Sequence, residues 1–217
     1  ANAGALALQG DKIVLEGTSW NASSKPVATV ARYTASGQLD TTFASGVGWA
    51  QVPSGYARFG SALAIQADNK ILVGGAMNGA VVIRLDADSG APDATFGTGG
   101  VAGIPGNAQN CSDDASGGTN SLLVTAGGIV AGILCGGDNS TLERAGVARF
   151  TAGGVLDPSF GTGGVSTYPA SPLVATFGAG LALTSTGSLV TALQNGLGGP
   201  PNTISALRWT SSGALDP

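Results

Sequence analysis

The glycine-rich phrase FGTGG, at 96–100 and again at 160–164, is the first feature of the sequence that could do chemistry. Glycine-rich loops bind phosphate when backbone N–H groups, a lysine and a helix N-terminus converge on one anion. Residues 165–172 read VSTYPASP, which has no lysine and no helical period. A looser copy of the phrase stands at 43–48, and the chain ends within a fourth copy of the surrounding motif. This repetition predicts a structural joint between repeats rather than a phosphate site.

A second recurring pattern places an arginine eight or nine residues before an aspartate in every repeat. An arginine fork can bond a carboxylate and nearby carbonyl groups at once, so we expect each pair to hold the turn between the third and fourth strands of its repeat. Four equivalent anion sites are the alternative interpretation. We expect the phenylalanines to fill the space between neighbouring repeats. The residues concerned are Arg32, Asp40, Phe43, Arg84, Asp93, Phe96, Arg149, Asp157, Phe160, Arg208 and Asp216.

The residue types also limit the chemistry that the chain can perform. The sequence contains no histidine, which removes Ser-His and Cys-His nucleophile pairs and the commonest zinc ligand. Most glycosidases need two carboxylates facing one bond, and only two glutamates are present, Glu16 at a predicted strand end and Glu143. We therefore expect no catalytic residues, no resident metal and no cofactor. A propeller-type lyase or glycoside hydrolase is the alternative.

Charge and composition bear on partners and location. Charged residues make up 10% of the chain and the formal net charge is −4, with nine Lys and Arg in all. Without a basic patch, binding to nucleic acid or to an anionic membrane surface is not expected. No apolar run reaches the roughly 20 residues that span a bilayer, so we expect no membrane insertion. Scarce lysine and glutamate, with abundant Thr, Ser, Asn and Gly, favour an extracellular, cell-surface or periplasmic bacterial protein.

Four tandem units must position these residues. Each unit has short runs rich in Val, Ile, Leu and Ala, bounded by Gly, Asn, Asp or Ser, which is typical of strands between turns. Four strands in each unit of this length indicate an all-β chain, a β-propeller of four four-stranded blades with the last blade incomplete. A β-solenoid and a β-sandwich are less consistent with the unit length and the repeated turns. The predicted repeats are 1–52, 53–104, 105–168 and 169–217 of a single domain.

The phrases ALAIQADNKILVGG and VIRLDADSGAPDATFGTGGV resemble the bacterial delta-60 repeat. The similarity extends over nearly the whole chain and is strongest in the first three units, while the D-G-K turn of the family pattern is altered in each unit. The resemblance implies a propeller related to the NHL type, found in large secreted or surface bacterial proteins. It implies no shared activity.

The long, unequal loops are predicted to lie on one face of the propeller, where binding residues often stand on a rigid frame. Aromatic rings with Asn and Asp nearby suit sugars, and clustered Asp suits calcium, although adjacent aspartates are more often a solvated loop. Cys111 and Cys135 are predicted to form a disulfide there; two buried thiols are the alternative. The candidate ligand-binding residues on this face are Trp20, Asn21, Tyr56, Arg58, Asp113, Asp114, Asp138 and Asn139.

These features predict a non-catalytic interaction module that binds a glycan or a protein through its long-loop face. A structural surface or filament protein is the second hypothesis, because the fourth unit supplies only three complete strands. Such a chain exposes an unpaired edge. We therefore expect either a segment of a larger propeller or a chain that completes its sheet with another copy.

Overall fold

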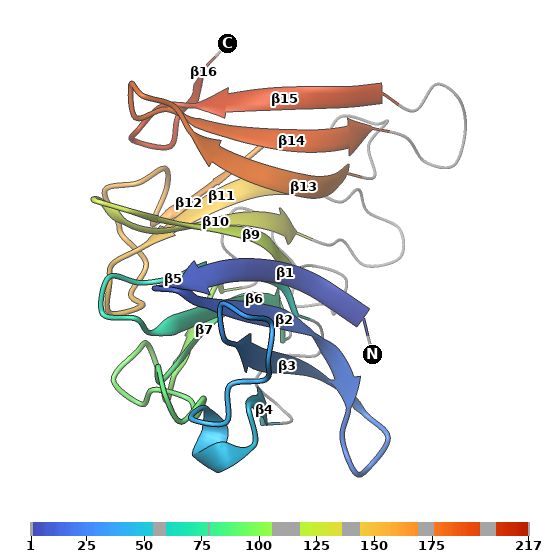
Figure 1. Ribbon diagram of the computed structural model, residues 1–217. Helices are drawn as coiled ribbons and strands as arrows, with labels where there is room; N and C mark the ends of the chain where they lie inside the picture. Colours follow the sequence, from blue (N-terminus) through green and yellow to red (C-terminus); the bar gives the residue numbers. More distant parts are fainter. Residues whose placement is uncertain are drawn as a thin grey trace.

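The computed structural model describes residues 2–53, 60–77, 79–105, 118–135, 144–168, 176–195 and 203–216. These residues form four antiparallel sheets, each of four strands in sequence order, which we call blades 1 to 4 (Figure 1). The prediction of an all-β chain with four four-stranded blades is therefore confirmed. Within the described residues, no helix has the length and hydrophobicity to cross a membrane.

The strands have the following bounds. Blade 1 contains β1 (Asn2–Gln9), β2 (Lys12–Trp20), β3 (Pro26–Tyr33) and β4 (Trp49–Gln51), with the short 3-10 turn η1 (Ala44–Gly46) before β4. Blade 2 contains β5 (Gly60–Ile65), β6 (Ile71–Ala76), β7 (Ala80–Leu85) and β8 (Val101–Gly103). Blade 3 contains β9 (Gly118–Thr125), β10 (Gly128–Cys135), β11 (Arg144–Phe150) and β12 (Val165–Thr167). Blade 4 contains β13 (Thr176–Leu183), β14 (Leu189–Asn195), β15 (Thr203–Trp209) and β16 (Leu215–Asp216).

Three apolar layers hold the blades together, one between each pair of neighbours. Val14, Val30 and Phe43 of blade 1 pack with Val73 and Ile83 of blade 2. The other face of blade 2 packs on blade 3, and Val130, Val147 and Phe160 of blade 3 pack with Leu189 and Trp209 of blade 4. Because every strand alternates its side chains between two faces, each blade needs a neighbour on both sides to bury them.

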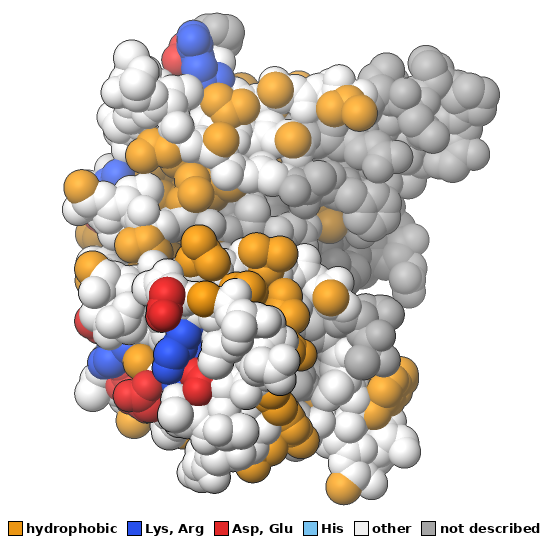
Figure 2. All heavy atoms as spheres, viewed as in Figure 1, with side chains coloured by type: hydrophobic (Ala, Val, Ile, Leu, Met, Phe, Trp, Pro, Cys, Tyr) orange, Lys and Arg blue, Asp and Glu red, His pale blue; other side chains and the backbone are white. Residues whose placement is uncertain are grey.

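The blades form an open arc. The first strands contact one another in sequence, β1 with β5, β5 with β9 and β9 with β13, and no comparable contact joins β13 to β1 within the described parts of the chain (Figure 1). Leu6 and Leu8 of β1 are 67% and 66% exposed, whereas Leu63, in the register position of Leu6 on β5, is 8% exposed. Exposed hydrophobic side chains lie over β1 in Figure 2. The outer face of blade 1 therefore lacks the neighbour that blades 2 to 4 have.

The last strand of blade 4 differs from the last strands of the other blades. In β16, Leu215 pairs with Trp209, in the register that single bridges occupy in the other blades, such as Leu39 with Tyr33. The three-residue strands β4, β8 and β12 lie beyond those bridges in their blades. The fourth sheet thus reaches four strands through the turn after β15, and it has no counterpart of β4 in the described residues.

A phenylalanine of each of the first three blades lies against a glycine of the next blade. Phe43, Phe96 and Phe160 are fully buried. A Cβ at Gly154 would lie 2.8 Å from Cδ2 and Cε2 of Phe96, and Gly154 has a φ of +83°. Gly37 stands at the same place in blade 1 with a φ of +80°, but no atom lies within 4 Å of its Cβ position. Blade 1 thus carries the receiving half of a joint with no ring in it.

This difference gives a matched test of the joint. Both Gly154→Ala and Gly37→Ala place a side chain at positive φ, which costs about 1–2 kcal/mol. Only Gly154→Ala also forces the ring of Phe96 to move, which adds about 1–3 kcal/mol. At about 2–4 °C per kcal/mol for a chain of this size, we expect Gly154→Ala to lower Tm by several degrees more than Gly37→Ala. Equal losses would mean that the ring contact contributes nothing.

Candidate functional site

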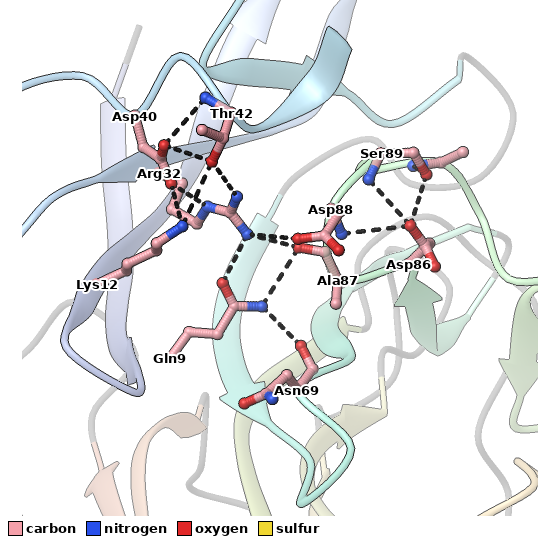
Figure 3. Close-up of polar contacts among 11 residues, drawn as sticks. Gln9, Lys12, Arg32, Asp40, Thr42, Asn69, Asp86, Ala87, Asp88 and Ser89 are labelled. Atoms are coloured by element: carbon pink, nitrogen blue, oxygen red, sulfur yellow. Dashed lines mark hydrogen bonds and ion pairs between the residues drawn. The ribbon is translucent and has the colours of Figure 1, made fainter. Parts of the chain in front are cut away.

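The strongest polar cluster of blade 1 is built around Arg32, which is 2% exposed (Figure 3). Its Nε donates to Oδ2 of Asp40 at 2.7 Å, and its Nη2 donates to Oγ1 of Thr42 at 3.2 Å. Its Nη1 donates to the carbonyl oxygen of Ala87 in blade 2 at 2.7 Å and to Oε1 of Gln9 at 2.9 Å. The guanidinium carbon lies 4.7 Å from the centroid of the Phe43 ring. The Arg32 side chain therefore contacts the turn of its own blade, the Phe43 ring and the backbone of blade 2.

Asp40 and Gln9 complete this cluster. Nζ of Lys12 lies 2.8 Å from Oδ2 of Asp40. This contact has the largest effect on the pKa of the Asp40 carboxyl, the hydrogen bond from Thr42 has the next largest, and together they hold that pKa well below its usual range. Gln9 Nε2 donates to the carbonyl oxygen of Asn69 in blade 2 at 2.7 Å. The carboxylate is thus committed to its own blade, while Arg32 and Gln9 both reach across to blade 2.

The same joint recurs twice along the chain. Arg84 Nε donates to Asp93 at 2.9 Å and its Nη1 donates to the carbonyl oxygen of Ala152 in blade 3 at 2.8 Å. Arg149 Nε donates to Asp157 at 2.8 Å and its Nη1 donates to the carbonyl oxygen of Ser211 in blade 4 at 2.9 Å. The ring centroids of Phe96 and Phe160 lie 4.7 Å from the guanidinium carbons of Arg84 and Arg149, respectively.

Backbone hydrogen bonds reinforce each joint beside the phenylalanine. The N–H of Ala44 donates to the carbonyl oxygen of Asp88 at 2.9 Å. The N–H of Gly97 donates to Gly153, and the N–H of Gly161 donates to Ser212, both at 2.8 Å. The phrase FGTGG therefore places an N–H donor against the following blade, and these donors are occupied by protein carbonyls rather than by an anion.

Arg208, the fourth repeated arginine, is paired with its aspartate although no blade follows it in the described residues. Arg208 Nε lies 2.8 Å from Oδ2 of Asp216, so the local pair is present, but the Arg208 side chain is 54% exposed. The predicted arginine–aspartate pairs are thus present in all four blades, and three of the arginines also bond the next blade, which the eight- or nine-residue spacing did not reveal. Gln9, just before the first turn of blade 1, also bonds the next blade, and a glutamine recurs at this position in blade 2 as Gln66.

Of the predicted ligand-binding residues, the structure describes two. Trp20 is the last residue of β2 and its side chain is 62% exposed. Asn21 Oδ1 accepts hydrogen bonds from the N–H groups of Ser23 and Lys25 at 2.9 and 3.0 Å, so its side chain closes the β2–β3 turn. The other six candidates lie outside the described residues: Tyr56, Arg58, Asp113, Asp114, Asp138 and Asn139.

The predicted disulfide lies partly, and the aspartates of the calcium alternative wholly, outside the described residues. Cys135 is the last residue of β10 and is 3% exposed. Its predicted partner, Cys111, is not among the described residues, so the disulfide stays a prediction. In the parts of the chain that the structure describes, no group of three or more Cys, Asp or Glu side chains is arranged to hold a metal ion. The aspartates considered for calcium are outside those parts.

Glu16 carries a buried carboxyl, and its predicted position at a strand end is wrong. It lies inside β2, not at a strand end, and is 1% exposed, between Ala5 on β1 and Val30 on β3. Neither carboxyl oxygen has a hydrogen-bond partner, and burial raises the pKa of Glu16 to about 8. A protonated carboxyl can serve as a general acid, but a glycosidase pair needs a second carboxylate, and the residues opposite Glu16 on the neighbouring strands are Ala5 and Val30.

Comparison of corresponding positions in blades 1 and 2 shows where the side chain of Glu16 lies. Gly74 has the corresponding register position in blade 2, and a Cβ there would lie 2.7 Å from Cγ2 of Thr119 in blade 3. In blade 2, Gly60 stands at the register position of Thr119 and has no side chain. The Glu16 side chain between blades 1 and 2 therefore corresponds in position to the Thr119 side chain between blades 2 and 3.

The joint predicts a large difference between two arginine substitutions. Arg84→Leu removes the side-chain donor to the carbonyl oxygen of Ala152 and one donor to Asp93, which still accepts from Lys70 and Thr95. We expect a loss of about 2–4 kcal/mol in the free energy of unfolding. Arg208→Leu removes a half-exposed pair and should cost at most about 1 kcal/mol. Urea unfolding followed by circular dichroism measures both. Equal costs would contradict the role assigned to the cross-blade bond.

Glu16 predicts an unusual dependence of stability on pH. Between pH 4.5 and about 8 the unfolded chain holds Glu16 ionised while the folded chain holds it protonated, so the free energy of unfolding falls as pH rises, by up to about 5 kcal/mol. The stabilising effect is complete below pH 4.5 and is lost as pH rises through 8. With no histidine in the chain, few other groups titrate in this window.

Glu16→Gln should remove this slope and make the protein more stable than the parent at pH 8, in thermal unfolding measured from pH 5 to 8.5. Asp68→Asn, at an exposed turn, is the control for loss of one carboxylate. A parent protein whose Tm is flat across this range would show that Glu16 is solvated or paired.

Comparison with known proteins supports the architecture. A family profile described as "Domain of unknown function (DUF5122) beta-propeller" matches residues 9–43, 66–96 and 133–160. These segments lie in the first three units, which also carry the arginine–phenylalanine contacts of the joints. No curated protein sequence matches the chain.

Solved structures show the same fold at low sequence identity. A GH43 endo-arabinanase from Bacillus licheniformis is 16% identical, with a TM-score of 0.54 over 97% of this chain and 74% of that one. An engineered GH43 glycoside hydrolase with endo-xylanase and exo-arabinofuranosidase activity is 14% identical, with a TM-score of 0.55 over 98% of this chain and 38% of that one. The chain therefore spans well under half of the second protein. Joint geometry, family profile and structural likeness together support an all-β, β-propeller fold of four tandem four-stranded blades.

Proposed function

We propose that the protein is a non-catalytic interaction module, extracellular or exposed at a bacterial surface or in the periplasm, that binds a glycan or a protein through its long-loop face. The finer identity of its repeats as delta-60, NHL-like units is part of the same proposal. The observation that carries it is Trp20, a large aromatic side chain 62% exposed at the end of β2. Exposed aromatic faces beside polar groups suit the apolar faces of sugar rings.

The surroundings of Trp20 support a fixed binding platform. Gln51 Nε2 donates to the carbonyl oxygen of Trp20 at 3.2 Å and to Oγ of Ser19 at 2.8 Å. Ser19 and Thr29 share a hydrogen bond of 2.6 Å between their hydroxyls. The turn closed by Asn21 follows directly. The backbone under the ring is therefore tied to β3 and β4, which keeps the entropy cost of binding low.

The hydrogen bonds of the repeated aspartates argue against a catalytic role for these carboxylates. Asp40, Asp93 and Asp157 each accept from the arginine of their own blade, and hydrogen bonds to their side chains hold the pKa of all three below the usual range. A carboxylate held ionised in this way is a poor proton donor at neutral pH. The repeated aspartates therefore serve the frame.

A glycan array probed with the parent protein and with Trp20→Ala tests this proposal. We expect binding to at least one glycan class and at least a tenfold loss in Trp20→Ala, about 1.4 kcal/mol. Trp49→Ala, at an aromatic side chain 45% exposed on β4, is the control and should bind like the parent. Release of reducing sugar from arabinan or xylan by the parent protein would favour the glycoside hydrolase alternative instead.

Self-assembly through the ends of the arc is a second candidate function, favoured by one observation. Both end blades have an open joint position in the described residues: no ring lies against Gly37, and the Arg208 side chain is 54% exposed. The outer face of blade 1 also has a hollow of about 260 Å³, lined in part by Leu15, Thr29 and Tyr33. Blade 4 of another copy, packed on the outer face of blade 1, would cover the exposed side chains of β1 and bring its Arg208 to a carbonyl oxygen of blade 1.

Light scattering over a range of protein concentrations tests the second candidate. Self-assembly predicts a mass that rises above 21.0 kDa with concentration and returns to the monomer in Leu8→Glu. Val155→Glu, at an apolar side chain 64% exposed on a turn of blade 3, is the matched control and should assemble like the parent. A monomer at all concentrations would exclude assembly of this chain with itself.

A further inference from the structure

The joint between blades 3 and 4 lacks two side chains that complete the other joints. In blades 1 and 2, a glutamine beside the arginine accepts from Nη1: Gln9 from Arg32 at 2.9 Å and Gln66 from Arg84 at 3.4 Å. At the corresponding register position of blade 3 stands Thr125, whose Oγ1 donates to the carbonyl oxygen of Gly128 at 2.9 Å. Thr125 therefore bonds its own turn and leaves Nη1 of Arg149 without this acceptor.

The lysine of the joint is also missing from blade 3, and the backbone prevents its replacement. Lys12 and Lys70 lie 2.8 and 2.6 Å from the aspartates of their blades. Gly128 takes this position in blade 3 with a φ of +126°, and a Cβ there would lie 2.2 Å from the carbonyl oxygen of Phe150. No other residue fits at Gly128 without a shift of the chain, so the missing lysine is a feature of this backbone.

A pocket of about 220 Å³ lies where these side chains are absent. Its apolar walls include Val130, Phe160, Leu183 and Leu189, and Arg149 reaches its edge with a side chain 17% exposed, against 2% for Arg32. Gly187 and Ser211 of blade 4 also line the pocket. Gly187 corresponds to Asn69, whose carbonyl oxygen accepts from Gln9 in the first joint.

Comparison of the three joints defines the chemistry of the vacant place. In the first joint, one carboxamide accepts from a guanidinium N–H and donates to a carbonyl oxygen of the next blade. The third joint keeps the guanidinium and the next-blade backbone but has no carboxamide. The Arg149 charge is already balanced by Asp157 at 2.8 Å, and no lysine is present, so a neutral acceptor fits better than an anion.

We propose that this pocket, between the β9–β10 and β13–β14 turns, is a binding site for a small ligand that presents a neutral amide group on a short apolar stem. The amide carbonyl accepts from Nη1 of Arg149, the amide N–H donates toward the backbone of blade 4, and the stem lies against Phe160 and Leu189. The site lies at the short-turn end of the blades, so it is independent of binding at Trp20.

Backbone amide NMR with propionamide as the probe tests the site directly. We expect saturable shifts at Gly127 and Gly187, with a dissociation constant of about 1–10 mM for so small a ligand. Sodium propionate has the same shape with a charge, and should bind at least about tenfold more weakly. No saturable shift with propionamide, or equal binding of propionate, would overturn the proposal.

Substitution of Thr125 provides the second test. Thr125→Gln restores the glutamine of the other joints, and we expect it to abolish propionamide binding and to raise Tm by about 2–4 °C. Thr184→Gln makes the same change at the corresponding position of blade 4, which is not among the residues lining the pocket, and should leave propionamide binding unchanged. Retained binding in Thr125→Gln, or a Tm that does not rise, would contradict an amide-shaped site.

Discussion

A four-stranded blade has two apolar faces and can bury them only against other blades, and the arginine joint fixes how neighbours meet. The guanidinium holds the turn of its own blade through an aspartate, lies over a phenylalanine ring and donates to a carbonyl of the next blade. A buried arginine is costly unless all its partners are present. The joint is therefore satisfied only when the next blade is in place, which couples folding of the blades along the chain.

Repetition made most of this frame predictable. The arginine, aspartate and phenylalanine recur at nearly constant spacing, so their structural role and the number of blades could be inferred from the sequence. The cross-blade carbonyl could not, because every residue has one and its position depends on how the sheets pack. The burial of Glu16 could not be inferred for the opposite reason: a glutamate occurs at this register position only in blade 1, where Gly74 stands in blade 2.

The two ends of the blades have different roles in this account. The short-turn end uses its charged residues to lock the blades, and its departures from the repeat, at Thr125 and Gly128, leave a pocket where the other joints are filled. The opposite end presents Trp20 on a turn closed by Asn21. Loss of a repeated residue thus leaves a pocket within the frame, whereas the end at Trp20 carries an exposed aromatic side chain.

The measurement that tests the central claim most directly is native-state hydrogen exchange at Gly97 and Gly161, whose N–H groups donate to the following blade. If the joints couple the blades, these two amides exchange only through the opening that also exposes the sheet amides of Val82 and Val147, with the same free energy of opening. Fast exchange at Gly97 and Gly161 while the sheets stay protected would show that the blades are separately stable, and would contradict the account.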